Sequence, residues 1–472
     1  MTEMNENPLD LLPEVLLAAS AVLGLLLGSW LPRARQWAVG LLACVACVAG
    51  LAAASVAAAD PATTAFGEAF AIDPVTSTSR IVVLGGTLLV LGVSFGPLRG
   101  DPRESEFYVL VQLAALGALM MAGTQDLLLL AAGYLLASIP AYTLAGFRKD
   151  GPGTEAALKY YVIGALLGVL MLTGITVLYA TGRGTGYPML GDAFRDAPKV
   201  LVATGAIGLL AGVLFKAGGV PAHFWVPDAV QGSNPPVAAL LTTIPKIGAL
   251  AALFRLGDAV FADSTLPWPA LIAVLAAASM TLGNLGAFFQ QDVKRLLAYS
   301  TISQVGYLLM PVAVAGRSDL AQQALLYYLA AYAVTNLGAF AVVCALPHAH
   351  TLDDYQGLAK QRPLLAASLV ICLLGLVGTP PTAVFLGKLE VFSAAFDGGY
   401  AWLAVLAAAN TVASLFYYLR WILPAVSRGG SGMPADGDRA ARVTAYAAAA
   451  ISLGLGLAGG PVLNVLAGSI SH

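Results

Sequence analysis

Charged residues are scarce in this sequence. Asp, Glu, Lys and Arg make up 11% of the 472 residues, and hydrophobic residues make up 58%. Soluble domains carry about 25% charged residues, so this chain has too few polar side chains to cover a water-facing fold. We therefore predict a protein that crosses the membrane many times. The formal net charge of −2 provides no excess positive charge for nucleic acid, which excludes a nucleic-acid partner.

Residues that hold metals or redox groups are also few. The chain has four cysteines and four histidines, and Cys44 and Cys47 lie in an Ala/Val-rich run without a second pair. This setting favours packing over a metal or redox site. No histidine spacing suggests paired haem ligands, no cysteine set suits an iron–sulfur cluster, and neither a GxGxxG nor a Walker motif is present. We predict no cofactor and no metal on this chain, so any redox groups lie on other subunits.

The N-terminus lacks the basic segment of a signal peptide. Glu3, Glu6 and Asp10 precede the first apolar run, at about 13–30. A signal peptide begins with positive charge. We therefore interpret this run as a retained first membrane span.

Long apolar runs fill most of the chain. A transmembrane helix needs about 20 apolar residues, and these runs predict an all-α polytopic membrane protein with about fourteen spans. The predicted spans are 13–30, 36–58, 81–98, 106–123, 126–147, 157–180, 200–217, 235–256, 267–289, 293–315, 320–346, 364–379 continued by 383–396, 400–424 and 441–465. The segment 60–80 is less apolar and is interpreted as an interfacial loop.

The basic residues test the span count through the positive-inside rule. With the N-terminus outside, the inner loops hold Arg33, Arg35, Arg99, Arg103, Arg148, Lys149, Lys294, Arg295, Lys360, Arg362, Arg428, Arg439 and Arg442. The outer loops hold Arg80, Arg183, Arg195, Lys199, Arg255 and Arg317. The ratio of about two to one favours an even number of spans and both termini outside. Arg420 is expected near a helix end, which leaves Lys159, Lys216, Lys246 and Lys388 as candidates for buried charge.

The stretch 215–246 differs from the other apolar runs. Lys216 and Lys246 lie near its ends, with Gly218, Gly219 and Pro221 between them. This pattern predicts an interrupted helix, a polar loop and a second hydrophobic helix. Broken helices are tolerated in membranes where the backbone lines a cavity, and a lysine within the membrane is by default a candidate functional residue. The alternative, stronger for Lys216, is a lysine that extends its ammonium group to the interface.

A second interruption follows about 160 residues later. Gly378, Pro380 and Pro381 resemble the first break, and Lys388 comes shortly after them. AALKYY at 156–161 likewise resembles ALLYYL at 324–329. Paired segments broken by glycine and proline in two halves of a chain point to a transporter built from repeats.

Buried lysines suit proton transfer. Burial disfavours the charged form of lysine, and ionisable groups along a hydrated path through a membrane form proton relays. We predict that Lys216, Lys246 and Lys388 transfer protons. Possible further members of the relay are Lys159, His223, Tyr299, Ser303 and Gln304. For the hydroxyl groups the alternative is a role in joining helices, and a structural hydrogen bond suits His223 equally well.

These motifs resemble those of a known family, the antiporter-like membrane subunits of respiratory complex I, and most closely its subunit N group. The resemblance runs from about Pro13 to Arg420. Its motifs are FGEAFAIDP at 66–74, EAALKYY at 155–161, FKAGGVPAHFWVPDAVQGSNPPV at 215–237, QQDVKRLLAYSTISQVGY at 290–307 and GTPPTAVFLGKLEVF at 378–392. The related multisubunit cation/proton antiporters share much of this pattern and are the alternative.

The resemblance implies two inverted five-helix repeats, each with one discontinuous helix. The expected segments are an N-terminal three-helix segment at 1–105, the repeats at 106–256 and 257–424, and a loop with the last span at 425–472. The family's proton-transfer roles carry onto Lys216, Lys246 and Lys388.

The resemblance also implies a place in a larger assembly. Quinone reduction elsewhere in an NADH-quinone oxidoreductase would drive proton translocation through this chain. NADH, FMN, iron–sulfur clusters and quinone would belong to the whole complex. The implied partners are the other membrane-arm subunits and the lipid bilayer, in a bacterial cell membrane.

The fifth span departs from the family pattern. The family usually has a glutamate there, within a GLELLS-like stretch, and this chain reads GYLLAS at 133–138 with Leu135 in its place. No Asp or Glu lies between Asp126 and Asp150, so Lys216 lacks the carboxylate partner that the resemblance implies. We expect weaker or modified pumping, and a structural subunit that has lost pumping is a further alternative.

Overall fold

The computed structural model describes residues 8–427 and 438–466. The first part contains η1 (Pro8–Leu11), α1 (Leu12–Trp30), η2 (Arg33–Arg35), α2 (Trp37–Ala57), β1 (Thr63–Ala65), β2 (Phe70–Ile72) and α3 (Pro74–Leu98). The middle contains α4 (Glu104–Gly123), α5 (Leu127–Ala145), α6 (Gly151–Gly182), α7 (Tyr187–Phe194), α8 (Lys199–Ala217), α9 (Trp225–Gly232), α10 (Pro235–Arg255) and η3 (Leu256–Val260). The last part contains α11 (Trp268–Phe288), α12 (Val293–Ala313), α13 (Ala321–Ala345), η4 (Asp353–Tyr355), α14 (Leu358–Gln361), α15 (Pro363–Val377), α16 (Ala383–Asp397), α17 (Ala401–Val426), α18 (Arg439–Leu457) and α19 (Gly459–Leu466).

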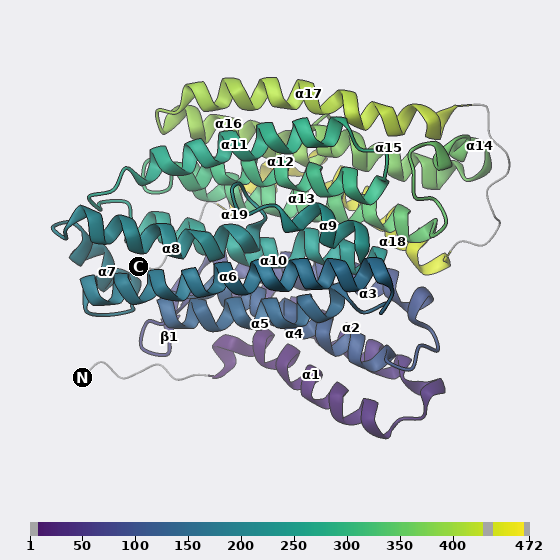
Figure 1. Ribbon diagram of the computed structural model, residues 1–472, viewed down its shortest axis with the longest axis horizontal. Helices are drawn as coiled ribbons and strands as arrows, with labels where there is room; N and C mark the ends of the chain where they lie inside the picture. Colours follow the sequence, from purple (N-terminus) through teal and green to yellow (C-terminus); the bar gives the residue numbers. More distant parts are fainter. Residues whose placement is uncertain (1–7, 428–437, 467–472) are drawn as a thin grey trace.

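The long helices lie side by side, and helices far apart in the sequence are neighbours, as α10 is of α4 and α3. In Figure 1 their colours run from purple at α1 to green at α17, and α18 returns to pack against α13 and α3. The short elements β1 and α7 lie at one end of the molecule, and α14 lies at the other. The helices therefore form an elongated bundle with two distinct ends.

The number of membrane crossings agrees with the sequence. Thirteen helices among the described residues are long and apolar enough to span a membrane, and α15 is a shorter apolar helix of the same kind. Because α16 resumes after the break that ends α15, these two helices together make one further crossing. The prediction of about fourteen spans in an all-α polytopic protein is confirmed.

Several predicted boundaries differ from the structure; helix α6, for example, begins at Gly151 and not at residue 157. Helix α3 begins at Pro74, earlier than the predicted residue 81. It does so because Asp73 caps it, its Oδ1 accepting the Thr76 backbone N–H at 3.0 Å, and proline suits the first turn of a helix. The preceding residues form the antiparallel hairpin β1–β2, with Thr64 opposite Ala71. The last predicted span, 441–465, is divided between α18 and α19.

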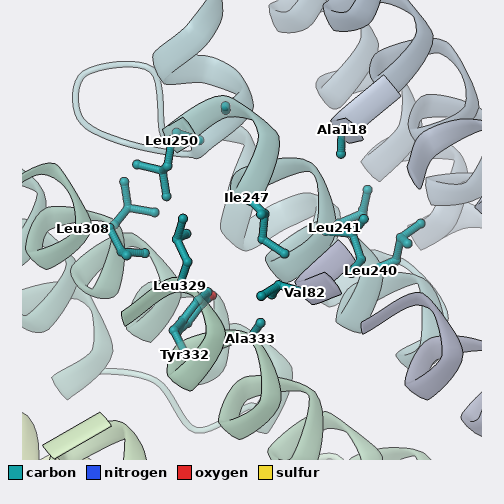
Figure 2. Packing of buried hydrophobic residues seen from close by; sticks show 14 of the residues in the cluster. Val82, Ala118, Leu240, Leu241, Ile247, Leu250, Leu308, Leu329, Tyr332 and Ala333 are labelled. Atoms are coloured by element: carbon teal, nitrogen blue, oxygen red, sulfur yellow. The ribbon is translucent and has the colours of Figure 1, made fainter. Parts of the chain in front are cut away.

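The centre of the bundle is α10, together with α12 and α13. The apolar stretch of α10 is buried along its whole length. Figure 2 shows Ile247 of α10 among Val82 of α3, Ala118 of α4 and Leu329 of α13. Helix α10 approaches α4 so closely that a Cβ at Gly248 would collide with the Ala118 backbone, as small residues at helix interfaces in membranes allow.

Two buried ion pairs join the N-terminal helices to each other and to the centre. Arg80 of α3 donates to both carboxylate oxygens of Glu14 in α1, at 2.8 and 2.9 Å. Arg255 at the end of α10 donates to both oxygens of Asp73, at 2.8 and 2.6 Å, and to the Ala122 carbonyl at 2.7 Å. The sequence predicted that Arg80 and Arg255 lie in outer loops, and this prediction is wrong. Both lie within helices, where the carboxylates of Glu14 and Asp73 neutralise their charges.

Candidate functional site: two broken helices and their lysines

The first broken helix is α8, which ends at Ala217. Gly218 follows with φ +74°, a left-handed conformation that glycine adopts without steric cost. The backbone N–H groups of Gly218 and Gly219 both donate to the Leu214 carbonyl, at 2.8 and 3.0 Å. This closes the last turn of α8, and the chain does not become helical again until α9. Because the chain leaves the helix here, the Ala217 carbonyl has no helical donor further along and is open to another partner.

Lys246 provides that partner from the middle of α10. Its side chain is completely buried, and its Nζ donates to the Ala217 carbonyl oxygen at 2.6 Å. The ring of Trp225 lies 5.5 Å away. A Cβ at Gly218 would collide with the Lys246 Nζ, so glycine is needed there both for its backbone angle and for space. The C-terminal end of a helix carries partial negative charge, which stabilises an ammonium group.

Lys216 has a different environment, although it lies in the same break. Its side chain is also completely buried, and within the described residues its Nζ has no hydrogen-bond partner. Aromatic rings surround it instead: the centre of the Tyr134 ring is 5.3 Å from Nζ, that of Tyr142 is 5.8 Å away and that of Tyr160 is 5.9 Å away. Ring faces attract a cation weakly compared with a carboxylate.

Helix α5 supplies two of these rings. Tyr134 is buried in α5, whereas the next residue, Leu135, has 44% of its surface exposed on the outside of this chain. Successive residues of a helix point about 100° apart, so the inward position against Lys216 belongs to Tyr134 and the outward position to Leu135.

The second broken helix repeats the geometry of the first. Helix α15 ends at Val377, Gly378 follows with φ +90°, and α16 begins after Pro380 and Pro381. Lys388 of α16 is 3% exposed and donates to the Val377 carbonyl at 2.8 Å and to Thr411 Oγ1 at 3.2 Å.

In both breaks a lysine ammonium binds the carbonyl that precedes the left-handed glycine. The lysine comes from a neighbouring helix, α10, in the first break. In the second it comes from α16, the second half of the broken helix itself. Lys246 and Lys388 therefore occupy equivalent positions relative to the two breaks, although they come from helices at different places in the chain.

Lys388 has additional partners that the sequence did not predict. The centre of the Tyr307 ring lies 4.1 Å from its Nζ, and the Tyr307 hydroxyl is 3.0 Å from Thr411 Oγ1. Thr411 belongs to α17 and Tyr307 to α12, so neither is near Lys388 in sequence. The only sequence signal for Thr411 was a hydroxyl in an apolar helix, which most often serves helix packing.

A buried polar network lies among α10, α12 and α13. Tyr332 Oη donates to the Thr242 carbonyl at 2.8 Å and contacts Thr301 Oγ1 at 3.2 Å. Asn336 donates to the hydroxyl groups of Thr242 and Thr243, at 3.0 and 2.9 Å. Thr242 is four residues before Lys246 and therefore on the same face of α10, a spacing that could have identified it from the sequence.

The predicted relay residue Gln304 joins this central region to the second break. Its Nε2 donates to the Leu376 carbonyl at 2.8 Å, and its Oε1 accepts from the Tyr328 hydroxyl. Ser303 is buried, and its hydroxyl has no partner in the part of the chain that the structure describes. Tyr299 is half-buried and lies beside Arg295, 5.9 Å from its guanidinium. Gln304 is thus the one of these three predicted residues that hydrogen-bonds to a broken helix within the described residues.

Lys159 lies in a salt-bridge cluster apart from the buried lysines. Its Nζ pairs with Glu155 at 2.8 Å, as their spacing along the helix predicts, and with Asp228 of α9 at 2.9 Å. Asp228 also pairs with Arg295 at 2.7 Å. The Lys159 side chain is 45% exposed, so this cluster lies at the surface of the chain. It links α6, α9 and α12. His223 is half-buried between the halves of the first broken helix, and its ring lies against Phe224.

Metal-binding potential is low in the described residues. Across 8–427 and 438–466, no group of three or more His, Cys, Asp or Glu side chains is arranged to hold a metal ion. The four cysteines are free thiols, and three of them are buried in the apolar core.

Comparison with known proteins gives consistent matches over nearly the whole chain. Residues 124–414 match the family described as NADH:quinone oxidoreductase/Mrp antiporter, transmembrane. The chain is 53% identical over 468 residues to NADH-quinone oxidoreductase subunit N 1 of Streptomyces griseus, covering 99% of both chains. It is also 53% identical over 464 residues to NADH-quinone oxidoreductase subunit N of Mycobacterium sp. strain JLS, covering 98% of both.

Solved structures show the same architecture. A chain of respiratory complex I from Thermus thermophilus superposes with a TM-score of 0.84 at 34% identity, over 97% of this chain and 100% of that one. A chain of the Mrp complex from Dietzia sp. superposes with a TM-score of 0.82 at 22% identity, over 98% of this chain and 96% of that one. At that lower identity the second likeness concerns the fold alone.

Proposed function

This chain belongs to the NADH:quinone oxidoreductase/Mrp antiporter family, in its subunit N group, and we propose that Lys216, Lys246 and Lys388 transfer protons across the membrane. As a member of this group it is a multi-pass membrane-arm subunit of a bacterial complex I, a translocase. Quinone reduction takes place elsewhere in that complex and drives the transfer. Residues 106–256 and 257–424 form two inverted five-helix repeats, and both termini lie outside the cytoplasm.

The observation that carries this proposal is the pair of lysine–carbonyl contacts. Lys246 and Lys388 are buried where an isolated ammonium group would be costly, and each binds the carbonyl at the end of a half-helix. A half-helix end stabilises the charged form without neutralising it, so the lysine can gain and lose a proton. A carboxylate partner would hold the proton much more tightly.

The environment of Lys216 supports a modified relay. It faces tyrosine rings and has no acidic partner within the described residues, and Leu135 stands at the family's glutamate position. Because tyrosine rings stabilise the protonated form of Lys216 less than a carboxylate would, the protonation of Lys216 responds less to a charge at Lys246. Because Tyr134 and not Leu135 faces Lys216, we expect Tyr134→Glu to increase the number of protons translocated per NADH, measured in membrane vesicles, whereas Leu135→Glu places its carboxylate outward. An unchanged or lower yield would contradict the modified relay.

The central experiment is Lys246→Ala in the native membrane. Quinone reductase activity and the proton gradient are recorded together, and assembly of the complex is verified on a native gel. Because the redox and transfer steps are coupled, we expect both signals to fall while the complex remains assembled. Lys199→Ala is the matched control, since Lys199 is an exposed lysine at the other end of α8.

Unchanged rates and an unchanged gradient in Lys246→Ala would reject the proposal. They would assign the chain a structural role in the membrane arm. Loss of the assembled complex would be resolved with Lys246→Met, which fills the same space without the charge.

A further inference from the structure

Lys294 is a buried lysine that the three-lysine relay does not include. It is the second residue of α12, and 7% of its surface is exposed. Its Nζ donates to the Gln231 carbonyl at 2.5 Å and to the Ser233 carbonyl at 2.9 Å. These carbonyls lie at the end of α9, the helix that follows the first break. The ammonium group of Lys294 therefore binds the C-terminal end of another helix.

This contact is of the same kind as those of Lys246 and Lys388, which bind the ends of α8 and α15. In the described part of the chain, no ion pair includes Lys294. The partial negative charge of a helix end stabilises an ammonium group without neutralising it. Lys294 thus shares the property that allows the other two lysines to gain and lose a proton.

The carboxylates around Lys294 have partners of their own. The nearest ionisable groups are Asp292, Arg148, Asp150 and Cys344. Asp150 pairs with Arg148 at 2.7 Å, and Asp292 caps α12 by accepting the Arg295 backbone N–H at 2.9 Å. Asp228 of α9 pairs with the Arg295 guanidinium. None of these carboxylates is committed to holding the proton of Lys294.

Lys294 lies just below the surface at the α14 end of the molecule. The neighbouring Val293 backbone N–H donates to the His350 carbonyl at 2.9 Å, in the segment that leads to η4 and α14. Asp292 and Gln231, on either side of Lys294, are half-buried. The positive-inside rule predicts that this end faces the cytoplasm, so Lys294 is within reach of cytoplasmic water.

The central polar network lies between Lys294 and Lys246. Thr301 is seven residues after Lys294 in α12, which is about 10 Å at 1.5 Å per residue. Thr242 is four residues before Lys246 in α10, which is about 6 Å. The Tyr332 hydroxyl joins the two helices, since it donates to the Thr242 carbonyl at 2.8 Å and contacts Thr301 Oγ1 at 3.2 Å.

The network has free capacity for hydrogen bonds. Asn336 donates to the hydroxyl groups of Thr242 and Thr243, but its own Oδ1 has no donor among the described residues. Asn336 is completely buried, and buried polar atoms are normally paired with protein or with ordered water. The Asn336 oxygen is therefore suited to hold a water molecule within the network.

We propose that Lys294 loads protons onto the first broken helix. Its neutral amine takes a proton from cytoplasmic water, and the resulting ammonium group passes that proton into the network of water and hydroxyl groups at Thr301, Tyr332 and Thr242. Lys246 receives the proton, and only N–H and O–H bonds form and break. This inference rests on the proposed function, because it supplies the protons that Lys246 transfers.

The first test is Lys294→Arg in the assembled complex. Arginine keeps the positive charge and the N–H donors that bind the end of α9, but it does not release its proton. We expect proton translocation in membrane vesicles to fall to a small fraction of the wild-type rate, while a native gel still shows the assembled complex. The matched control is Lys360→Arg, at an exposed lysine of α14 on the same end, which should translocate protons at the wild-type rate.

Wild-type translocation in Lys294→Arg would overturn the proposal, because it would show that a permanent charge at the end of α9 is sufficient. If this variant fails to assemble, Thr301→Val decides, since it keeps the side-chain shape and removes one hydroxyl of the route. We expect slower translocation in Thr301→Val and recovery in Thr301→Ser. An unchanged rate in Thr301→Val would also overturn the proposal.

The Lys246→Ala experiment separates this inference from the proposed function. Full translocation in Lys246→Ala would reject the proposed function itself. Loss of translocation in Lys246→Ala, together with wild-type translocation in Lys294→Arg, would reject only the role of Lys294.

Discussion

Lys246 and Lys388 reach equivalent acceptors from different positions in the chain. Each binds the carbonyl before a left-handed glycine, at 2.6 and 2.8 Å. A helix break leaves its last carbonyls without helical donors, and in a membrane an unsatisfied carbonyl is costly. The lysine thus satisfies the backbone, and the backbone in turn makes the buried charge tolerable.

Thr411 is the residue that distinguishes the site of Lys388 from that of Lys246. Thr411→Val keeps the shape of the side chain but removes the hydroxyl that accepts from Lys388 at 3.2 Å. Hydrogen bonds to charged groups contribute about 1.5–3 kcal/mol, so the protonated lysine becomes less stable. We expect a lower proton yield per NADH, measured in membrane vesicles, and Thr411→Ser should restore it. Equal yields in all three proteins would show that the hydroxyl serves packing only.

Gly218 should tolerate no side chain. Gly218→Ala places a Cβ against the Lys246 Nζ at a left-handed residue, a conformation that costs an L-residue about 1–2 kcal/mol. We expect reduced thermal stability of the complex and loss of proton translocation.

Gly85→Ala is the control for Gly218→Ala. Gly85 lies inside α3, and a Cβ there meets nothing within 4 Å. Alanine favours a helix over glycine by about 1 kcal/mol, so this variant should be as stable as wild type or more so. Similar losses in both glycine variants would contradict the argument.

At the scale of elements, two buried ion pairs fix how the N-terminal helices meet the centre. Arg255 extends from the end of α10 to Asp73, the residue that caps α3. The same aspartate therefore both starts a helix and binds the guanidinium group. This connection holds the central helix, which carries Lys246, in register with α3.

Asp73→Asn tests that connection. Removing one partner of a buried ion pair costs about 3–5 kcal/mol because the remaining charge is left unpaired. We expect a clear fall in the thermal unfolding temperature of the purified complex. Asp263→Asn is the comparison, since its pair with Arg195 is largely exposed and exposed pairs contribute about 0–1 kcal/mol. If both substitutions lowered the unfolding temperature equally, burial would not explain the contribution of the Asp73–Arg255 pair.

At the scale of the whole molecule, the two ends of the bundle differ in charge. The end with α14 and η2 holds most of the arginines and lysines outside the membrane, and the end with α7 and β1 holds fewer. By the positive-inside rule we predict that the α14 end faces the cytoplasm.

Cysteine labelling tests this orientation. In intact cells, a membrane-impermeant maleimide should label Met189→Cys of α7 and should not label Ala34→Cys of η2. Both positions are exposed in this chain, so only their side of the membrane distinguishes them. Permeabilised cells provide the control, in which both are labelled. The reverse pattern in intact cells would place the termini inside.

The sequence alone determined the membrane class, the number of spans and both helix breaks. Long apolar runs have one stable solution in lipid, since only helices satisfy their own backbone there. Both breaks combine a left-handed glycine with a proline that follows it closely, whereas single prolines such as Pro140 and Pro245 lie inside continuous helices. These properties are local, which is why spans such as 235–256 were predicted to within a residue or two of α10.

Only the tertiary structure decided which groups surround each lysine. Tyr134 rather than Leu135 faces Lys216, Lys159 pairs at the surface with Asp228, and Thr411 reaches Lys388 from α17. Such contacts join residues far apart in the chain and depend on how each helix is rotated about its axis. Almost uniformly apolar helices give little periodic signal for that rotation, so packing against neighbouring helices determines it.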